Sequence, residues 1–186
     1  HREWIVGNEC ALGVLYLELL APERARRVLD AAMALANELR SQFWIRWATG
    51  ALAGAYCLLD DGTRALMLLE PVLSAGTPMD AEAKRYCWAR RAELALAQGD
   101  PARALDIVER LIASAPGMAP GRVITYLWKL KGEALIALGD TEEAQSLLLA
   151  AVENAKATEE RFLLWRLHAS LGQLYCALGR QPEAVR

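Results

Sequence analysis

The stretches WARRAELALAQGDPARAL (88–105) and WKLKGEALIALGDTEEA (128–144) decide the fold of this chain. In both, an apolar segment ends at a Gly-Asp pair, and a few polar residues then lead to an alanine, Ala104 or Ala144. Glycine is favoured just after the end of a helix, whereas acidic residues and proline are favoured at the start of one. Each stretch therefore predicts a helix, a tight turn and a second helix.

The same pattern recurs along the whole chain. Five stretches align, and they read LAPERARRVL, DDGTRALMLL, QGDPARALDIV, LGDTEEAQSLL and LGRQPEAV. Their shared alanines, called anchor alanines below, are Ala25, Ala65, Ala104, Ala144 and Ala184, with separations of 40, 39, 40 and 40 residues. Five equivalent positions at nearly constant spacing indicate an internal repeat.

The helix before each turn repeats as well. Twelve residues before the anchor alanine the residue is always small: Gly13, Ala53, Ala92, Gly132 and Gly172. A small residue lets a neighbouring helix approach closely, so we expect a helix crossing there. Sixteen residues before the anchor, two repeats carry Trp88 and Trp128 and the fifth carries His168, which we expect to be a packing residue.

The pattern W-x-x-[L/K/R]-[G/A]-x-x-Y…G-D-x-x-x-A resembles the tetratricopeptide repeat (TPR), although the usual TPR period is about 34 residues. The resemblance covers essentially the whole chain and implies an all-α fold. It implies a right-handed superhelical solenoid of antiparallel helix pairs, with about four and a half TPR-like repeats. The predicted repeats are 3–41, 42–79, 80–118, 119–158 and a truncated 159–186, in a single domain 1–186.

Helix boundaries follow from the turn residues. First helices are predicted over 3–20, 42–59, 80–98, 119–138 and 159–178. Second helices are predicted over 22–40, 63–75, 101–114, 141–157 and from 181 onward. The acidic turn residues Asp60, Asp61, Asp100 and Asp140 are expected to cap the helices that follow them.

The composition excludes several classes of protein. Hydrophobic residues make up 54% of the chain and charged residues 24%, with a net charge of −2, so the chain is globular and carries no basic stripe for nucleic acid. No apolar run is long enough to span a bilayer, so we expect no membrane contact. The four cysteines are far apart in sequence, which predicts buried, reduced thiols in a cytoplasmic protein.

The sequence carries no recognisable catalytic motif. It lacks a G-x-x-x-x-G-K-[ST] loop, a G-x-S-x-G elbow and an H-E-x-x-H helix, and His168 is its one internal histidine. We therefore expect a protein that is not an enzyme, with no catalytic residue, no cofactor and no bound metal.

Candidate binding residues follow from the resemblance, which implies that the first helix of each pair lines a concave face. The predicted ligand- or partner-binding residues are Trp47, Tyr86, Arg90, Glu93, Tyr126, Lys129, Glu133, Arg166 and Gln173. Aromatic rings beside basic groups would suit an anionic or sugar-like ligand or an acidic peptide. The alternative is that the aromatics pack between helices and the charges pair, as Lys129 would with Glu133 at i, i+4.

Three functional hypotheses remain open. The stretch RFLLWRLHASLGQLYCALGRQPEAV (161–185) and the 40-residue period resemble the C-terminal superhelical sensor region of large ATP-binding, LuxR-type (maltose-activator-like) transcription regulators and related signalling ATPases. That resemblance implies a regulatory module that senses an inducer or a protein partner. The alternatives are a free-standing scaffold for peptide segments and a self-association element that dimerises through open repeat ends. Because the sequence stops in the first turn of a helix without a polar cap, we expect a fragment of a longer multidomain protein.

Overall fold

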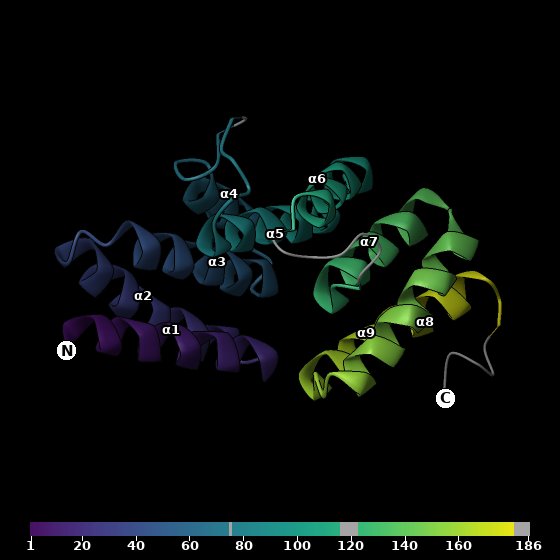
Figure 1. Cartoon of the computed structure of the whole chain (residues 1–186), viewed down its shortest axis with the longest axis horizontal. Helices are drawn as coiled ribbons and strands as arrows, with labels where there is room; N and C mark the ends of the chain where they lie inside the picture. The colour runs from purple at the N-terminus through teal and green to yellow at the C-terminus, as the bar shows by residue number, and fades with distance from the viewer. Residues whose placement is uncertain (75, 116–122, 181–186) are drawn as a thin grey trace. The chain divides into compact units, whose positions relative to one another are not determined.

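The computed structural model of the chain describes residues 1–74, 76–115 and 123–180, which contain α-helices and no strand (Figure 1). First helices of the repeats are α1 (Arg2–Glu18), α3 (Gln42–Leu58), α5 (Glu82–Ala97), α7 (Thr125–Leu138) and α9 (Arg161–Ala177). Second helices are α2 (Pro22–Glu38), α4 (Gly62–Leu69), α6 (Pro101–Ala113) and α8 (Thr141–Ala157). The chain forms two compact units, unit 1 (His1–Gln98) and unit 2 (Gly99–Arg186), which are described separately below.

The predicted helices are confirmed within two residues at most boundaries, with α4 as the main exception. We predicted a helix over 63–75, but α4 ends at Leu69. Pro71 explains the early end, because a proline has no N–H for the helical ladder and its ring crowds the preceding turn. The predicted start of the fourth first helix is also wrong, because α7 begins at Thr125 and the described residues 123 and 124 are not helical. The predicted helical residues 119–122, the predicted helix from 181 onward and its anchor Ala184 lie outside the described residues.

An anchor alanine and the small residue before it form the core of the pair α1/α2 in unit 1 and of the pair α7/α8 in unit 2. Ala25 in unit 1 and Ala144 in unit 2 are completely buried. A methyl group added to Gly13 would lie 2.4 Å from Cγ of Leu29, and one added to Gly132 would lie 2.7 Å from Cγ of Leu148. Each leucine comes four residues after its anchor alanine, so the close crossing predicted from the repeat is confirmed in both units.

Every turn inside a repeat has one residue with a left-handed backbone, five positions before the anchor alanine. Three of them are the expected glycines, Gly99, Gly139 and Gly179, with φ between 70° and 91°. The other two are Leu20 (φ 52°) and Asp60 (φ 59°). The turn geometry is therefore a property of the repeat, and glycine is used in only some copies.

The predicted caps are confirmed in part. The side chains of Asp61 and Asp100 each accept a hydrogen bond, at 3.1 Å, from the backbone N–H three residues later. The prediction is wrong for Asp140, whose side chain makes no capping hydrogen bond, and for Asp60, which forms the turn itself.

Successive helices share apolar cores within each unit. In unit 1, Leu17 of α1, Leu29 of α2 and Leu52 of α3 belong to one buried cluster. In unit 2, Leu148 of α8 packs with Leu167 of α9 in another cluster. None of the described helices combines the length and the apolar character that crossing a membrane requires.

Candidate binding site on the first helices

In unit 1, two of the predicted aromatic residues stack on each other across neighbouring first helices. Trp47 of α3 and Tyr86 of α5 both stand 18 residues before an anchor alanine, and their ring centroids are 4.4 Å apart with planes inclined by 32°. Gly50 makes room for this contact, since an added methyl would lie 2.6 Å from Cδ1 of Tyr86. Equivalent positions of the second and third repeats therefore meet side by side.

The predicted charges of α5 continue this stack. Arg90 lies over the Tyr86 ring, 4.9 Å from its centroid, and its Nη2 donates a hydrogen bond to the tyrosine Oη at 3.0 Å. Its Nη1 donates to Oε2 of Glu93 at 2.5 Å. We call Trp47, Tyr86, Arg90 and Glu93 the α3–α5 cluster. Burial raises the pKa of Tyr86, against the opposing effect of the nearby guanidinium, so the phenol stays neutral at neutral pH.

Unit 2 pairs its charges differently. Nζ of Lys129 lies 2.7 Å from Oε1 of Glu133, which confirms the predicted i, i+4 pair. Ser170 of α9 donates a second hydrogen bond to the same oxygen at 2.6 Å. We call these three residues the α7–α9 cluster. Sequence reasoning missed Ser170, although it stands 14 residues before its anchor alanine, as Arg90 does.

The remaining predicted residues are Tyr126, Arg166 and Gln173. Tyr126 packs against the apolar core that α8 and α9 share. The guanidinium of Arg166 lies 5.2 Å from the ring of its neighbour Trp165. Gln173 is exposed on α9. The structure thus places two local clusters, one in each unit.

Both clusters hold each basic group against a carboxylate. Arg90 and Lys129 are buried, with 6% and 7% of their surface exposed, and each forms an ion pair within its own helix. A ligand phosphate or carboxylate would have to compete with Glu93 or Glu133 for these cations. The geometry therefore favours a ligand that binds through aromatic contacts and hydrogen bonds over a ligand that binds through a negative charge.

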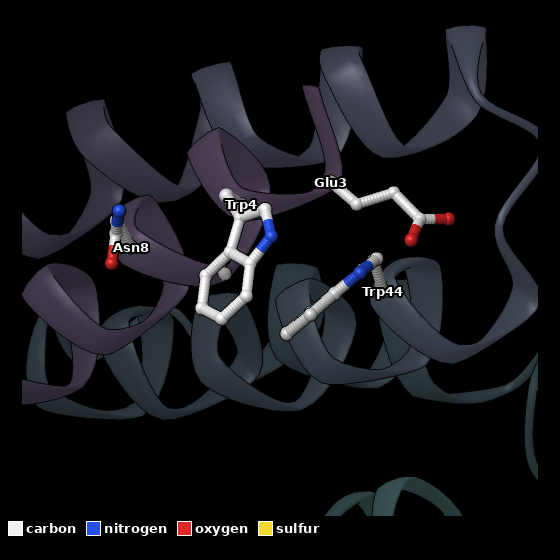
Figure 2. A pocket seen from close by; sticks show the side chains of 5 residues that line it. Glu3, Trp4, Asn8 and Trp44 are labelled. Atoms are coloured by element: carbon white, nitrogen blue, oxygen red, sulfur yellow. The ribbon is translucent and has the colours of Figure 1, made fainter. Parts of the chain in front are cut away.

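A cavity that the sequence did not predict lies at the start of α1 and α3 in unit 1 (Figure 2). It has a volume of about 480 Å³ and is lined by Glu3, Trp4, Gly7, Asn8 and Trp44. A signal was present in the repeat, because Trp4 and Trp44 both stand 21 residues before an anchor alanine.

The thiols and the histidine differ in part from expectation. All four cysteines are free, and Cys10 and Cys87 are buried as predicted, with burial raising their pKa values to about 11 and about 12. The prediction of a buried thiol is wrong for Cys176, which is exposed. The prediction of a packing role is wrong for His168, which is exposed as well. The buried stripe of α9 runs through Leu167 and Leu174, on a different side of the helix. Among the described residues, no three His, Cys, Asp or Glu side chains gather in a way that could hold a metal ion.

Comparison with known proteins identifies the fold. No protein-family model matches the chain, and no curated protein does. Among solved structures, the chain is similar to a Podosopora anserina protein described as a kinesin light chain with nearly identical TPR-like repeats. The TM-score is 0.63 at 19% identity, over 99% of this chain and 91% of that one. A variant of the same protein gives a TM-score of 0.62 at 19% identity, over 96% and 89% of the two chains. The chain therefore has the all-helical, TPR-like repeat fold.

Proposed function

We propose that this chain is a non-catalytic, protein-binding repeat module whose first helices present the partner-binding face. The observation that carries this proposal is the stacking of Trp47 on Tyr86 from neighbouring repeats. It supports a face on which equivalent positions of the neighbouring first helices α3 and α5 form a row within unit 1. A row of repeat-related side chains matches the regular spacing of an extended peptide or of one face of a helix.

The character of the two clusters supports a peptide partner over a small anionic inducer. The ion pairs Arg90–Glu93 and Lys129–Glu133 leave little net charge on the face. Phe43, which is 45% exposed, extends the aromatic surface, with its ring centroid 6.4 Å from that of Trp47. Aromatic rings with one polar edge are enriched at protein interfaces, because they bury a large area and still satisfy a hydrogen bond.

The wider role that we propose is that of a sensor region in a cytoplasmic, multidomain bacterial transcription regulator or signalling ATPase. Its support is the resemblance of residues 161–185 and of the repeat period to such regulators. In this role the module would bind a protein, a peptide or a small-molecule inducer, without contacting nucleic acid or membrane itself. A parent gene that encodes a nucleotide-binding domain beside this segment would agree with the role, and a parent that encodes repeats alone would contradict it.

The test is a thermal-shift screen of the 186-residue chain against peptide pools, sugars and nucleotides. A ligand that binds the native state raises its melting temperature by mass action. We expect peptides to raise it and sugars and nucleotides to leave it unchanged. A hit among the sugars or nucleotides alone would contradict the protein-binding proposal and favour a small-molecule sensor.

Variants then place the binding site of a peptide hit. Trp47→Leu keeps an apolar side chain but removes the ring that stacks on Tyr86, and we expect it to weaken binding about tenfold. The control is Met67→Ala, since Met67 is an exposed apolar residue in the same unit but on the second helix α4. Equal losses from the two variants would contradict the assignment of the face to the first helices.

One observation favours self-association as a second candidate. Leu52 of α3 is 3% exposed against the preceding helix pair, whereas its repeat equivalent on α1, Leu12, is 39% exposed. Leu15 on α1 and Leu19 directly after it are also exposed, so this part of unit 1 presents apolar side chains that another copy could cover. Sedimentation of the chain at micromolar concentration tests this candidate, and a monomer would exclude it.

A further inference from the structure

The cavity of unit 1 that holds Trp4 and Trp44 has an aromatic floor and an aromatic wall. Figure 2 shows the Trp4 ring broadside and the Trp44 ring edge-on beside it, with the Glu3 carboxylate on the side of Trp44 and Asn8 on the other side of Trp4. The residues Glu3, Trp4, Gly7 and Asn8 lie in the first two turns of α1, and Trp44 lies in the first turn of α3.

Trp44 is a fixed part of this cavity. A methyl group added to Gly7 would lie 3.0 Å from Cη2 of Trp44, so the glycine lets the indole lie directly against α1. Phe43 meets the Trp44 ring edge-on, with centroids 4.8 Å apart and planes inclined by 77°. The ring also packs on the buried cluster that contains Val6 and Ala48. The floor is therefore formed before any ligand arrives.

Trp4 forms the exposed wall of the cavity. It is 75% exposed, the highest value among the large hydrophobic residues that the structure describes. An indole left this far in water contributes little to the stability of the fold, so its position opposite a fixed second indole is suited to contact with a ligand.

The charge of the lining selects the ligand. The lining contains a carboxylate, Glu3, and an amide, Asn8, but no basic side chain. The neighbouring Arg2 is engaged with Glu38 of α2, and within the described part of the chain Glu3 forms no ion pair. The negative faces of two indoles and one available carboxylate together attract a cation. A purely apolar ligand would instead remove Glu3 from water without a partner, at a cost in free energy.

We propose that this cavity binds an arginine side chain of a partner protein. A guanidinium is planar, stacks on an indole face and presents paired N–H donors to a carboxylate, whereas a lysine ammonium is a strongly hydrated point charge. The volume of about 480 Å³ is larger than a single side chain needs, so it also admits the residues beside the arginine. This site goes beyond the proposed function, because none of its five residues belongs to the two clusters, and it can bind or fail to bind independently of them.

The test uses the 186-residue chain and the probe peptide acetyl-Gly-Arg-Gly-amide, followed by NMR of the tryptophan indole N–H signals. A peptide with citrulline in place of arginine has nearly the same shape without the charge, and a lysine peptide has the charge without the planar group. We expect the arginine peptide to shift the signals of Trp4 and Trp44 and to bind at least threefold more tightly than either of the other two. The variants Trp4→Phe and Trp44→Phe assign these two signals.

Two variants test the assigned contacts. Trp4→Ala removes an exposed side chain and should weaken arginine binding about tenfold, with an unchanged melting temperature. Glu3→Gln keeps the shape and removes the charge, and it should weaken binding about threefold. The control is Glu82→Gln, which changes an exposed carboxylate in the first turn of α5 and should leave binding unchanged.

Several results would overturn the proposal. Equal binding of the citrulline peptide would show an apolar cavity, and tighter binding of the lysine peptide would exclude a guanidinium site. Unchanged binding by Glu3→Gln or Trp4→Ala would place the peptide elsewhere. The Trp47→Leu variant of the α3–α5 cluster should bind the arginine peptide normally, which separates failure of this site from failure of the proposed function.

Discussion

Unit 1 makes its intra-repeat turns with Leu20 and Asp60, whereas unit 2 makes the equivalent turns with Gly139 and Gly179, and Gly99, its first residue, has the same position in its own repeat. All five residues have positive φ and stand five positions before an anchor alanine. A left-handed backbone costs an ordinary L-residue roughly 1 kcal/mol or more, and glycine avoids this cost. The two units thus hold the same backbone with residues of very different intrinsic preference.

The difference teaches that packing of the helix pair, and not the turn residue, sets the turn. What the units share is the crossing itself, where Gly13 meets Leu29 and Gly132 meets Leu148. Buried contacts along this crossing outweigh the strain at Leu20 because a single buried leucine contributes about 2 kcal/mol. The crossing should therefore be sensitive to substitution in both units, and the turn only mildly so.

The largest expected effect is at the crossing. Gly132→Leu places a side chain where even a methyl group would lie 2.7 Å from Leu148, and Gly13→Leu does the same against Leu29. We expect each variant to lower the free energy of unfolding by about 3 kcal/mol, because overpacking forces shifts of side chains and backbone. Urea denaturation followed by circular dichroism measures the change.

The control for the crossing is Gly76→Leu, since an added methyl at Gly76 meets nothing within 4 Å. It should leave the urea midpoint within experimental error of the unsubstituted chain. A midpoint unchanged by Gly132→Leu would mean that the repeat register is wrong, and a loss confined to one unit would break the equivalence of the two crossings.

The next largest loss of stability should differ between the α3–α5 cluster and the α7–α9 cluster. Arg90→Met removes two part-buried interactions at once, the ion pair with Glu93 and the hydrogen bond to Tyr86, and we expect a loss of about 2 kcal/mol. Lys129→Met leaves Glu133 with its hydrogen bond from Ser170, so the loss should be smaller, about 1 kcal/mol. Denaturant midpoints of the two variants make the comparison directly.

An exposed pair serves as the reference for these variants. Arg110 and Asp106 lie 3.5 Å apart on the surface of α6, and Arg110→Met should change stability by less than about 0.5 kcal/mol. Adding Ser170→Ala to Lys129→Met should widen that variant's loss toward the Arg90→Met value. If Arg90→Met and Lys129→Met lowered the free energy of unfolding equally while Ser170 was intact, the role given to Ser170 would be contradicted.

Much of this fold could be predicted from the sequence because each repeat carries its own local signals. Gly139 predicts the end of α7 and Pro101 the start of α6, and both predictions are confirmed. The left-handed turns at Leu20 and Asp60 could not be predicted this way, since these residues do not favour positive φ and only tertiary packing imposes it. The prediction that His168 is a packing residue is wrong for a related reason. Its position in the repeat is that of Trp88 and Trp128, but α9 leaves this position exposed.

The candidate sites were predictable only where partners lie on one helix. The Lys129–Glu133 pair follows from i, i+4 spacing, and it is confirmed. The stacking of Trp47 on Tyr86, the hydrogen bond of Ser170 and the cavity between Trp4 and Trp44 each join residues about 40 positions apart. Periodicity identifies such residues as equivalent, but the register between neighbouring helices decides whether they touch.

The smallest change in stability is expected when turn residues are exchanged between the two units. Gly139→Leu puts the residue of the first turn of unit 1 into unit 2 and should cost about 1 kcal/mol, since the left-handed backbone is then strained. The reverse change, Leu20→Gly, should stabilise unit 1 by about 0.5 kcal/mol, because relief of strain is partly offset by the greater entropy of glycine in the unfolded chain. Thermal unfolding of both variants, with Asp60→Gly beside them, supplies the measurement. Asp60→Gly should gain less than Leu20→Gly, because aspartate tolerates the left-handed region better than leucine does. Destabilisation by Leu20→Gly would show that the leucine side chain contributes more through packing than its backbone loses through strain.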